Sequence, residues 1–412
     1  PTLSTRPVCS DCASTPHVLG QYMNKTLQPI MKAQNTYFKD SFALKEILDN
    51  LLLPPYASLF TYNAISMYTK IDTRDCIECL LNLLHLPDTQ CKFPHYSPEA
   101  LISAFKIVMY NNRMCFGDII VCQLTGIAMG MSPAPTIANL YIAAYEQSHL
   151  PPYFPKPLLF LKRFIDDGFG IWLHDSDPVT DEKNWLDFKK MINQSGLTWT
   201  FSIRSPQATF LDMIISIKNG RLITQLFKKP GALQLFIPPQ SCHPPGVITG
   251  LIMGNVLQIF RLCSLAQDVK KELNAFYEAI LARGYQLATI KPIFEKAINN
   301  AKNYIKYPMK YREQKKLQKN QLSTKQRLFL HVPFHPNNPP SRVLQNLWHT
   351  KVYHPPGKLP LNKLTNREGE TIFTNQLVIA YSRAPNLGNL LSYRRIDRRS
   401  GPKVSSYMIR HE

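Results

Sequence analysis

Two adjacent acids carry the strongest chemical signal in this sequence. Asp166 and Asp167 follow one apolar stretch, and a second apolar stretch begins after Gly168. Neighbouring carboxylates repel each other, and a divalent cation removes that repulsion. Mg²⁺ favours such hard oxygen ligands, and ions held by carboxylates serve phosphoryl and nucleotidyl transfer. The pair therefore indicates a Mg²⁺ site, although the dipeptide taken alone is more often an Asp-Gly turn with an extra solvated acid.

The flanking pattern predicts a hairpin that presents the two acids at its tip. Residues 158–165 and 169–173 have the composition of strands, joined at Asp167-Gly168 by a favoured turn. The alternation of strands and helices predicts an α+β fold with helices packed on one face of an antiparallel sheet. Periodicity and capping predict further strands at 58–62 and 197–203, helices at 43–53, 136–148, 250–267 and 269–301, helix starts at Asp72 and Ser97, and a hairpin turn at Asn219-Gly220.

The charge balance points to a polyanionic partner. The chain has 48 Lys and Arg against 28 Asp and Glu, a net charge of +20. Each phosphate that a cation neutralises releases condensed counterions, which favours nucleic-acid binding. In residues 304–327 tyrosines interleave with cations, as on surfaces that follow a nucleic-acid backbone, although a solvated helix or linker has the same composition. The candidate contacts are Lys228, Lys229, Lys310, Arg312, Lys315 and Lys316.

Composition also restricts the expected cellular compartment and the metal sites that the cysteines could form. No apolar run reaches the ~18 residues that span a bilayer, and no signal peptide opens the chain, so we expect an intracellular protein of the nucleus or cytoplasm without a membrane partner. The first residue is Pro1 rather than Met, as expected of a fragment or of an incomplete gene model. Nine cysteines without a secretory signal favour reduced thiols. Zinc would require the pairs Cys9/Cys12 and Cys76/Cys79 to converge, and the second pair lies in an apolar helical stretch.

A set of short motifs spread along most of the chain resembles one family. They resemble the reverse transcriptases of Penelope-like retroelements, and their combination is more specific than any single motif. A Gly/Pro-rich turn before a helix would explain the segment 123–141 without a ligand, but it would not explain the other matches. The matching segments are 6–8, 129–133, 138–141, 164–167, 210–212, 228–230, 241–244 and 386–387.

The resemblance implies a right-hand polymerase fold and RNA-directed DNA synthesis from a primer 3′-hydroxyl. It implies Mg²⁺ at Asp166 and Asp167, with an RNA template, a DNA primer and dNTPs as partners. It assigns incoming-nucleotide contacts to Arg6, Tyr68, Met129 and Gly130, where Tyr68 would be the steric gate against a 2′-hydroxyl or else a palm-core aromatic. The implied parts are partial fingers at 1–55, a palm with a fingers insertion at 56–230, a helical thumb at 231–305, and a basic, loop-rich extension at 306–412 without a C-terminal nuclease module.

One position departs from the family pattern. The family places a further metal-binding Asp in a strand five residues before the aromatic residue, and this chain has Asn63 there. An amide offers an oxygen but no charge, so the resemblance implies a weakened two-metal site and an impaired or inactive polymerase. A catalytically silent nucleic-acid-binding protein with the same fold is the alternative, and an unrelated metal-dependent nuclease using the acidic pair is the third.

Overall fold

The computed structural model describes residues 14, 16–94, 96–116, 118–149, 157–231, 235–241, 243–244, 246–307, 313, 317, 328–334, 337–353 and 377–382. The chain divides into two compact units. Unit 1 comprises residues 1–229 and 262–265, and unit 2 comprises 230–261 and 266–412.

Unit 1 combines helices with antiparallel sheets, which confirms the mixed architecture expected from the sequence. Its helices are α1 (His17–Lys32), α2 (Ser41–Leu48), α3 (Met67–Lys70), α4 (Thr73–His85), α5 (Pro87–Lys92), α6 (Pro98–Tyr110), α7 (Ala134–His149) and α8 (Pro178–Asn193). Its strands are β1 (Ala57–Ala64), β2 (Arg113–Phe116), β3 (Ile119–Cys122), β4 (Leu158–Phe164), β5 (Asp167–Leu173), β6 (Trp199–Phe201), β7 (Gln207–Phe210), β8 (Met213–Lys218) and β9 (Arg221–Leu226).

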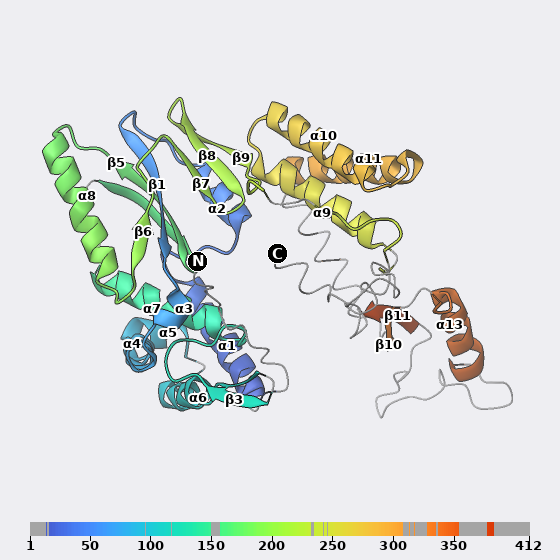
Figure 1. The fold of residues 1–412 in the computed structure, drawn as a ribbon, viewed down its shortest axis with the longest axis horizontal. Helices are drawn as coiled ribbons and strands as arrows, with labels where there is room; N and C mark the ends of the chain where they lie inside the picture. Colours follow the sequence, from blue (N-terminus) through green and yellow to red (C-terminus); the bar gives the residue numbers. More distant parts are fainter. Residues whose placement is uncertain are drawn as a thin grey trace. The chain divides into compact units, whose positions relative to one another are not determined.

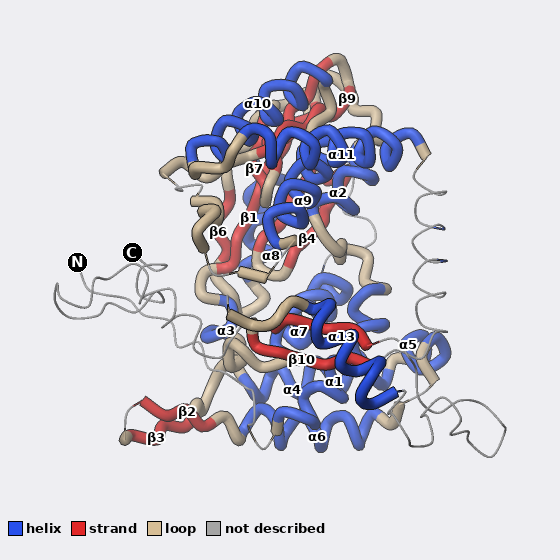
Figure 2. The backbone as a smooth tube through the Cα atoms, turned by 90° about the vertical axis from the view of Figure 1, so that its right-hand side faces the viewer, coloured by secondary structure: helices blue, strands red, loops and turns tan. Residues whose placement is uncertain are grey.

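The central sheet has the strand order β4-β5-β1-β6, and β7-β8-β9 form a second sheet. Helix α8 runs beside the central sheet, whereas α1, α4, α6 and α7 gather at one end of unit 1 (Figures 1 and 2). Figure 2 shows the β2–β3 hairpin projecting from this helical group. The arrangement leaves the end of the central sheet, where β1 ends and β5 begins, next to the helical group.

Alternation along β1 divides the core of unit 1 between the two faces of the sheet. Phe60 and Tyr62 point into a cluster with Trp172 of β5 and with Trp185 and Phe188 of α8. On the opposite face, residues of β1 and β5 pack with α2 and with strands β7 and β8. Because successive side chains of a strand point to opposite faces, burial on both faces fixes the register of β1.

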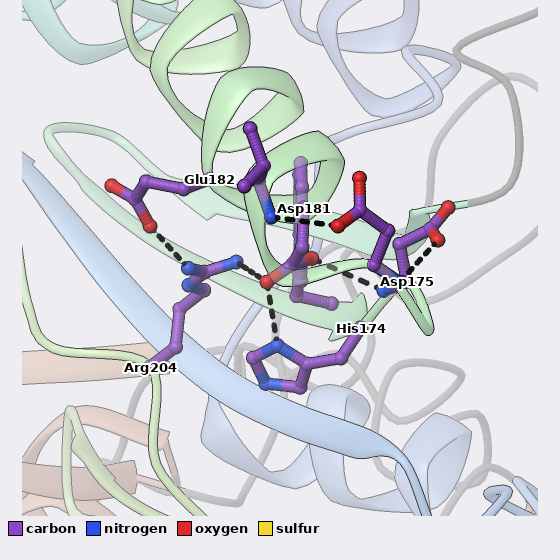
Figure 3. A network of polar contacts seen from close by, with 8 residues as sticks. His174, Asp175, Asp181, Glu182 and Arg204 are labelled. Atoms are coloured by element: carbon purple, nitrogen blue, oxygen red, sulfur yellow. Dashed lines mark hydrogen bonds and ion pairs between the residues drawn. The ribbon is translucent and has the colours of Figure 1, made fainter.

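A buried acid pins α8 to the sheet (Figure 3). The Asp181 side chain is 9% exposed, and its carboxylate accepts hydrogen bonds from Trp172 Nε1 at 2.9 Å and from His174 Nδ1 at 2.9 Å. Arg204 donates to the same carboxylate at 2.8 Å and also lies over the Trp185 ring. A buried carboxylate is stable only when it is paired and hydrogen-bonded, so these contacts hold α8 in one position.

Nearby residues in the sequence correctly predicted two helix starts and one hairpin turn. The side chain of Asp72 accepts hydrogen bonds from two backbone N–H groups at the start of α4, and Ser97 caps α6 before Pro98. Asn219 and Gly220 both have positive φ angles, of 51° and 70°, between β8 and β9, as a type I′ hairpin requires. These elements follow the sequence because their start and stop signals lie within the elements themselves.

The predicted hairpin turn at Asp167-Gly168 is wrong by two residues. Strand β4 ends at Phe164, which pairs with Asp167, so the turn residues are Ile165 and Asp166. Gly168 lies inside β5, where an added Cβ atom would lie 2.0 Å from Tyr62 Cε1. The glycine is therefore needed for packing against the Tyr62 ring, and Ile165 supplies the left-handed turn conformation with φ 58°.

In the described residues of unit 2, three long helices replace the two helical stretches predicted. The stretch 269–301 is interrupted at residues 283–286, where Gly284 has φ 91°. The described elements are α9 (Val247–Leu262, whose last residue belongs to unit 1), α10 (Ala266–Ala282), α11 (Leu287–Lys306), β10 (Leu328–Pro333), α13 (Ser341–Leu347), the π-helical turn η1 (Trp348–Tyr353) and β11 (Leu377–Ser382). Across the described residues of both units, no helix combines the length and apolarity needed to cross a membrane.

Candidate metal and nucleotide site

The candidate site forms where β1 ends beside the β4–β5 hairpin. Asn63 pairs with Asp167 across the β1–β5 ladder, and Ala64 N donates to Asp166 O at 3.0 Å. Directly opposed residues of antiparallel strands share a face, so Asn63 and Asp167 lie side by side. Tyr62 and Ala64 are buried on the other face, whereas Asn63 is exposed. The amide therefore stands beside the two acids.

A pocket of about 290 Å³ brings together four residues that the sequence singled out. Its lining includes Asn63, Tyr68, Met129 and Asp166, which come from β1, α3, the loop before α7, and the β4–β5 turn. These residues lie up to about a hundred positions apart in the chain, so only the fold joins them. The rest of the lining is made by Ala64, Ile65, Ser66, Met67, Thr69 and Thr200.

Close backbone contact fixes the loop before α7 against α3. Ile127 N donates to Tyr68 O at 2.6 Å, and Gly126 has φ 84°. A Cβ atom on Gly126 would lie 2.8 Å from that same Tyr68 oxygen, so this position requires glycine for both its conformation and its packing. Met129 follows three residues later and reaches the pocket.

Asp166 lines the pocket, whereas Asp167 does not, and the charge of Asp166 affects the pKa values of both Asp167 and Tyr68. Burial raises the pKa of Asp167, and the neighbouring charge of Asp166 raises it further. Burial and then the Asp166 charge raise the pKa of the Tyr68 phenol to about 12, so this phenol is neutral at physiological pH. Burial is the larger cause of both shifts, and a cation bound near Asp166 would oppose the smaller, electrostatic contribution.

The donor set fits Mg²⁺ but with less charge than three acids would supply. Two carboxylates and the Asn63 amide oxygen are hard oxygen ligands of the kind that Mg²⁺ accepts. Within the described residues, no group of three or more His, Cys, Asp or Glu side chains could hold a metal ion. Asn63, which pairs with Asp167 in the β1–β5 ladder, supplies an amide oxygen and not a third carboxylate.

Sequence reasoning missed two contributors to this site. Thr200 of β6 pairs with Asn63, donates from Oγ1 to Asn63 O at 3.2 Å, and lines the pocket. The alternating pattern of 197–203 could have indicated it as the outward-facing neighbour of β1. Arg163 is 2% exposed and donates a hydrogen bond to the Ile165 carbonyl in the hairpin turn. No local sequence pattern indicates this role.

The other predicted site residues are not gathered in this pocket. Gly130 is exposed with φ 110° beside Met129 and does not line the pocket. Lys228 and Lys229 are exposed just after β9. Cys76 is buried and Cys79 is partly buried in α4. Predicted residues outside the described part of the chain are Arg6, Cys9, Cys12, Lys310, Arg312, Lys315 and Lys316.

A family model matches a helical segment that belongs mostly to unit 2. Residues 235–295 match a family described as an animal helix-turn-helix domain. The matched segment contains α9, α10 and the first part of α11, and residues 263–265 form the connection between α9 and α10. No curated protein matches the chain.

The solved structures similar to this chain include telomerases and viral polymerases. Telomerase from Candida albicans with a TWJ fragment of telomeric RNA shares 11% identity at a TM-score of 0.48, over 68% of this chain and 47% of that one. Apo telomerase from Candida tropicalis shares 13% at 0.40, over 69% and 52%. The BmCPV RNA-dependent RNA polymerase shares 13% at 0.42, over 65% and 24%. The chain spans about half the length of these two telomerase chains, and all three TM-scores lie below 0.5.

Proposed function

We propose that this chain is the polymerase part of a Penelope-like reverse transcriptase, an RNA-directed DNA polymerase that acts on an RNA template, a DNA primer and dNTPs. The observation that carries the proposal is the pocket in which Asn63, Tyr68 and Met129 meet Asp166. A nucleotidyl-transfer site needs metal-binding oxygens, a surface for the sugar and a backbone loop for the base, and these residues would supply all three in one place.

Each residue would have a distinct task in this proposal. Asp166 and Asp167, with the Asn63 amide oxygen, would hold Mg²⁺. When bound, Mg²⁺ would neutralise phosphate charge and activate the attacking hydroxyl as a nucleophile. The neutral Tyr68 ring would pack under the sugar and exclude a 2′-hydroxyl, and the loop at Met129 and Gly130 would face the nucleotide. Contacts from Arg6 to the triphosphate, and a right-hand arrangement of fingers, palm and thumb, belong to the same proposal.

Asn63 sets the expected activity. Replacing a charged ligand by a neutral one weakens metal binding and charge stabilisation by several kcal/mol, and about 3 kcal/mol lowers a rate by roughly a hundred-fold. We therefore expect weak primer extension by the natural chain and extension on the order of a hundred-fold faster by Asn63→Asp. The measurement is extension of a labelled DNA primer on an RNA template with Mg²⁺ and dNTPs.

The control variant is Asn63→Asp combined with Asp166→Asn, which has the same net charge as the natural chain and should lose the gain. Equal, robust extension by the natural chain and by Asn63→Asp would contradict the impairment. Cleavage of a labelled duplex in the absence of nucleotides would instead reveal a nuclease.

The natural asparagine at position 63 also favours a second function. A protein that keeps the polymerase fold and binds nucleic acid without synthesis would tolerate Asn63. In that case Asn63→Asp would not extend a primer, whereas the natural chain would still bind a primer–template duplex.

A further inference from the structure

A buried guanidinium lies directly behind the candidate site. The Arg163 side chain is 2% exposed, and its Glu146 partner is 5% exposed. A charge so fully withdrawn from water is tolerated only when its hydrogen-bonding capacity is met. Arg163 Nε donates to Glu146 Oε1 at 2.8 Å, and Nη2 donates to Oε2 at 3.2 Å, a bidentate pairing.

The remaining donors of Arg163 join two elements. Nη2 also donates to Asn139 O at 3.3 Å, and Nη1 donates to Asn139 Oδ1 at 3.0 Å. The last bond runs from Nη1 to Ile165 O at 2.9 Å. All five N–H donors of the guanidinium are therefore used, four on α7 and one on the β4–β5 turn.

The bond to Ile165 O acts on a strained backbone position. Ile165 is β-branched and has φ 58°, a conformation that such residues adopt only when their surroundings impose it. Asp166 follows, and its own carbonyl accepts the bond from Ala64 N at 3.0 Å. The carbonyls on both sides of the Asp166 Cα atom are thus held, one by the Arg163 side chain and one by strand β1.

We propose that Arg163, with Glu146 as its counter-ion, is a positioning residue that fixes the Asp166 carboxylate in the pocket by holding the Ile165 carbonyl. Because Asn139 and Glu146 lie on α7, directly after the loop that carries Met129, the same guanidinium also locks that loop's helix to the hairpin. The inference deepens the proposed function, since it rests on Asp166 being a metal ligand.

The test uses Arg163→Lys in the full chain. An ammonium keeps the charge opposite Glu146 but lacks the five-donor fork, so it cannot hold the Ile165 carbonyl at the same time. In metal-free protein, we expect hydrogen exchange at the Ala64 amide to accelerate about tenfold or more. In a Mn²⁺ titration followed by electron paramagnetic resonance, we expect the dissociation constant to rise about ten- to a hundred-fold.

Thr36→Val is the matched control. Thr36 Oγ1 donates to Glu146 Oε2 at 2.6 Å, so this variant removes a bond from the same carboxylate without touching the hairpin turn. It should lower the melting temperature while leaving Ala64 exchange and Mn²⁺ affinity unchanged.

A second variant covers poor folding of Arg163→Lys. Arg163→Met with Glu146→Leu replaces the buried pair by apolar side chains of similar size, an exchange that buried pairs often tolerate. If any folded Arg163 variant shows the same Ala64 exchange rate and the same Mn²⁺ affinity as the natural chain, the positioning role is overturned. Faster Ala64 exchange in variants of a chain that binds no Mn²⁺ would instead support the positioning role and refute the metal site.

Discussion

At the scale of single residues, the candidate site is defined by two neighbouring carboxylates whose negative charges repel each other. Asp167 lies opposite Asn63 in the β1–β5 ladder and next to Asp166 in the chain. A third acid at position 63 would raise the repulsion in the metal-free protein, and an amide lowers it. The amide therefore costs the metal-free protein less stability and would offer less negative charge to the cation of the proposed site.

This balance predicts a pH-dependent stability effect at Asp167. Because burial and Asp166 raise its pKa, the folded chain binds more protons than the unfolded chain between the ordinary carboxyl pKa and the raised value. The loss of folding stability that the raised pKa causes is absent below the ordinary carboxyl pKa. It is complete once the pH has risen through the raised pKa. In metal-free buffer, Asp167→Asn should therefore raise the melting temperature at pH 7 by roughly 2 °C and leave it unchanged near pH 3.

Mg²⁺ should reverse the ranking of the two chains. A ligand that binds only the folded state stabilises it by mass action, so added Mg²⁺ should stabilise the natural chain more than Asp167→Asn. Asp88→Asn, an exposed acid in α5, is the control and should change little at either pH. A lower melting temperature for Asp167→Asn at pH 7 without metal would contradict the assignment.

At the scale of elements, α8 depends on one buried carboxylate. Burial opposes ionisation of Asp181, but hydrogen bonds from Trp172 and His174 and the charge of Arg204 outweigh it and lower its pKa. Removing Asp181 leaves the buried Trp172 N–H without its acceptor and leaves Arg204 with the exposed Glu182 as its acidic partner. Asp181→Ala should therefore destabilise unit 1 by about 3 kcal/mol, measured by urea unfolding followed through tryptophan fluorescence.

The matched control removes the other acid that Arg204 contacts. Glu182 bonds Arg204 at 2.7 Å but is 54% exposed, so Glu182→Gln should cost no more than about 1 kcal/mol. Since the Asp181 pKa is lowered, its stabilisation is present above the ordinary carboxyl pKa and is lost as the pH falls through the lowered value. Equal losses in the two variants would show that burial of Asp181 is irrelevant.

Elements were predictable where their signals are local, and less so where distant residues decide. The caps at Asp72 and Ser97 and the turn at Asn219-Gly220 could be read directly, because each signal lies within a few residues of its effect. Gly168 was misassigned to a turn because its role is set by Tyr62, which is distant in sequence. The break near Gly284 was missed although Arg-Gly after an apolar run is a helix C-cap signal.

The candidate site was predictable in its residue types but not in its support. Asp166, Tyr68 and Met129 could be singled out from motifs, and the fold brings them to one pocket. The five bonds of Arg163 could not be foreseen, because Asn139 and Glu146 meet it only after α7 packs under the hairpin. A buried polar network depends on tertiary contacts, whereas periodicity reports only which face of an element is apolar.

At the scale of the whole molecule, the net charge of +20 should govern nucleic-acid binding. Cations that contact phosphates release counterions, so the binding constant falls linearly with salt on logarithmic axes, and each such cation contributes about one unit of slope. Lys228 and Lys229 are exposed at the end of unit 1, directly after the β8–β9 hairpin. If both contact phosphates, their removal should change the slope and not only the affinity.

The measurement is binding of a fluorescent RNA–DNA duplex to the full chain at several salt concentrations. We expect Lys228→Ala with Lys229→Ala to reduce the slope by about two units and to weaken binding equally for duplexes of different sequence. Lys183→Ala with Lys190→Ala removes the same charge from exposed positions of α8 and should leave the slope unchanged. If both pairs lower the affinity equally and neither alters the slope, the two lysines act only through net charge and the β8–β9 end is not a nucleic-acid contact.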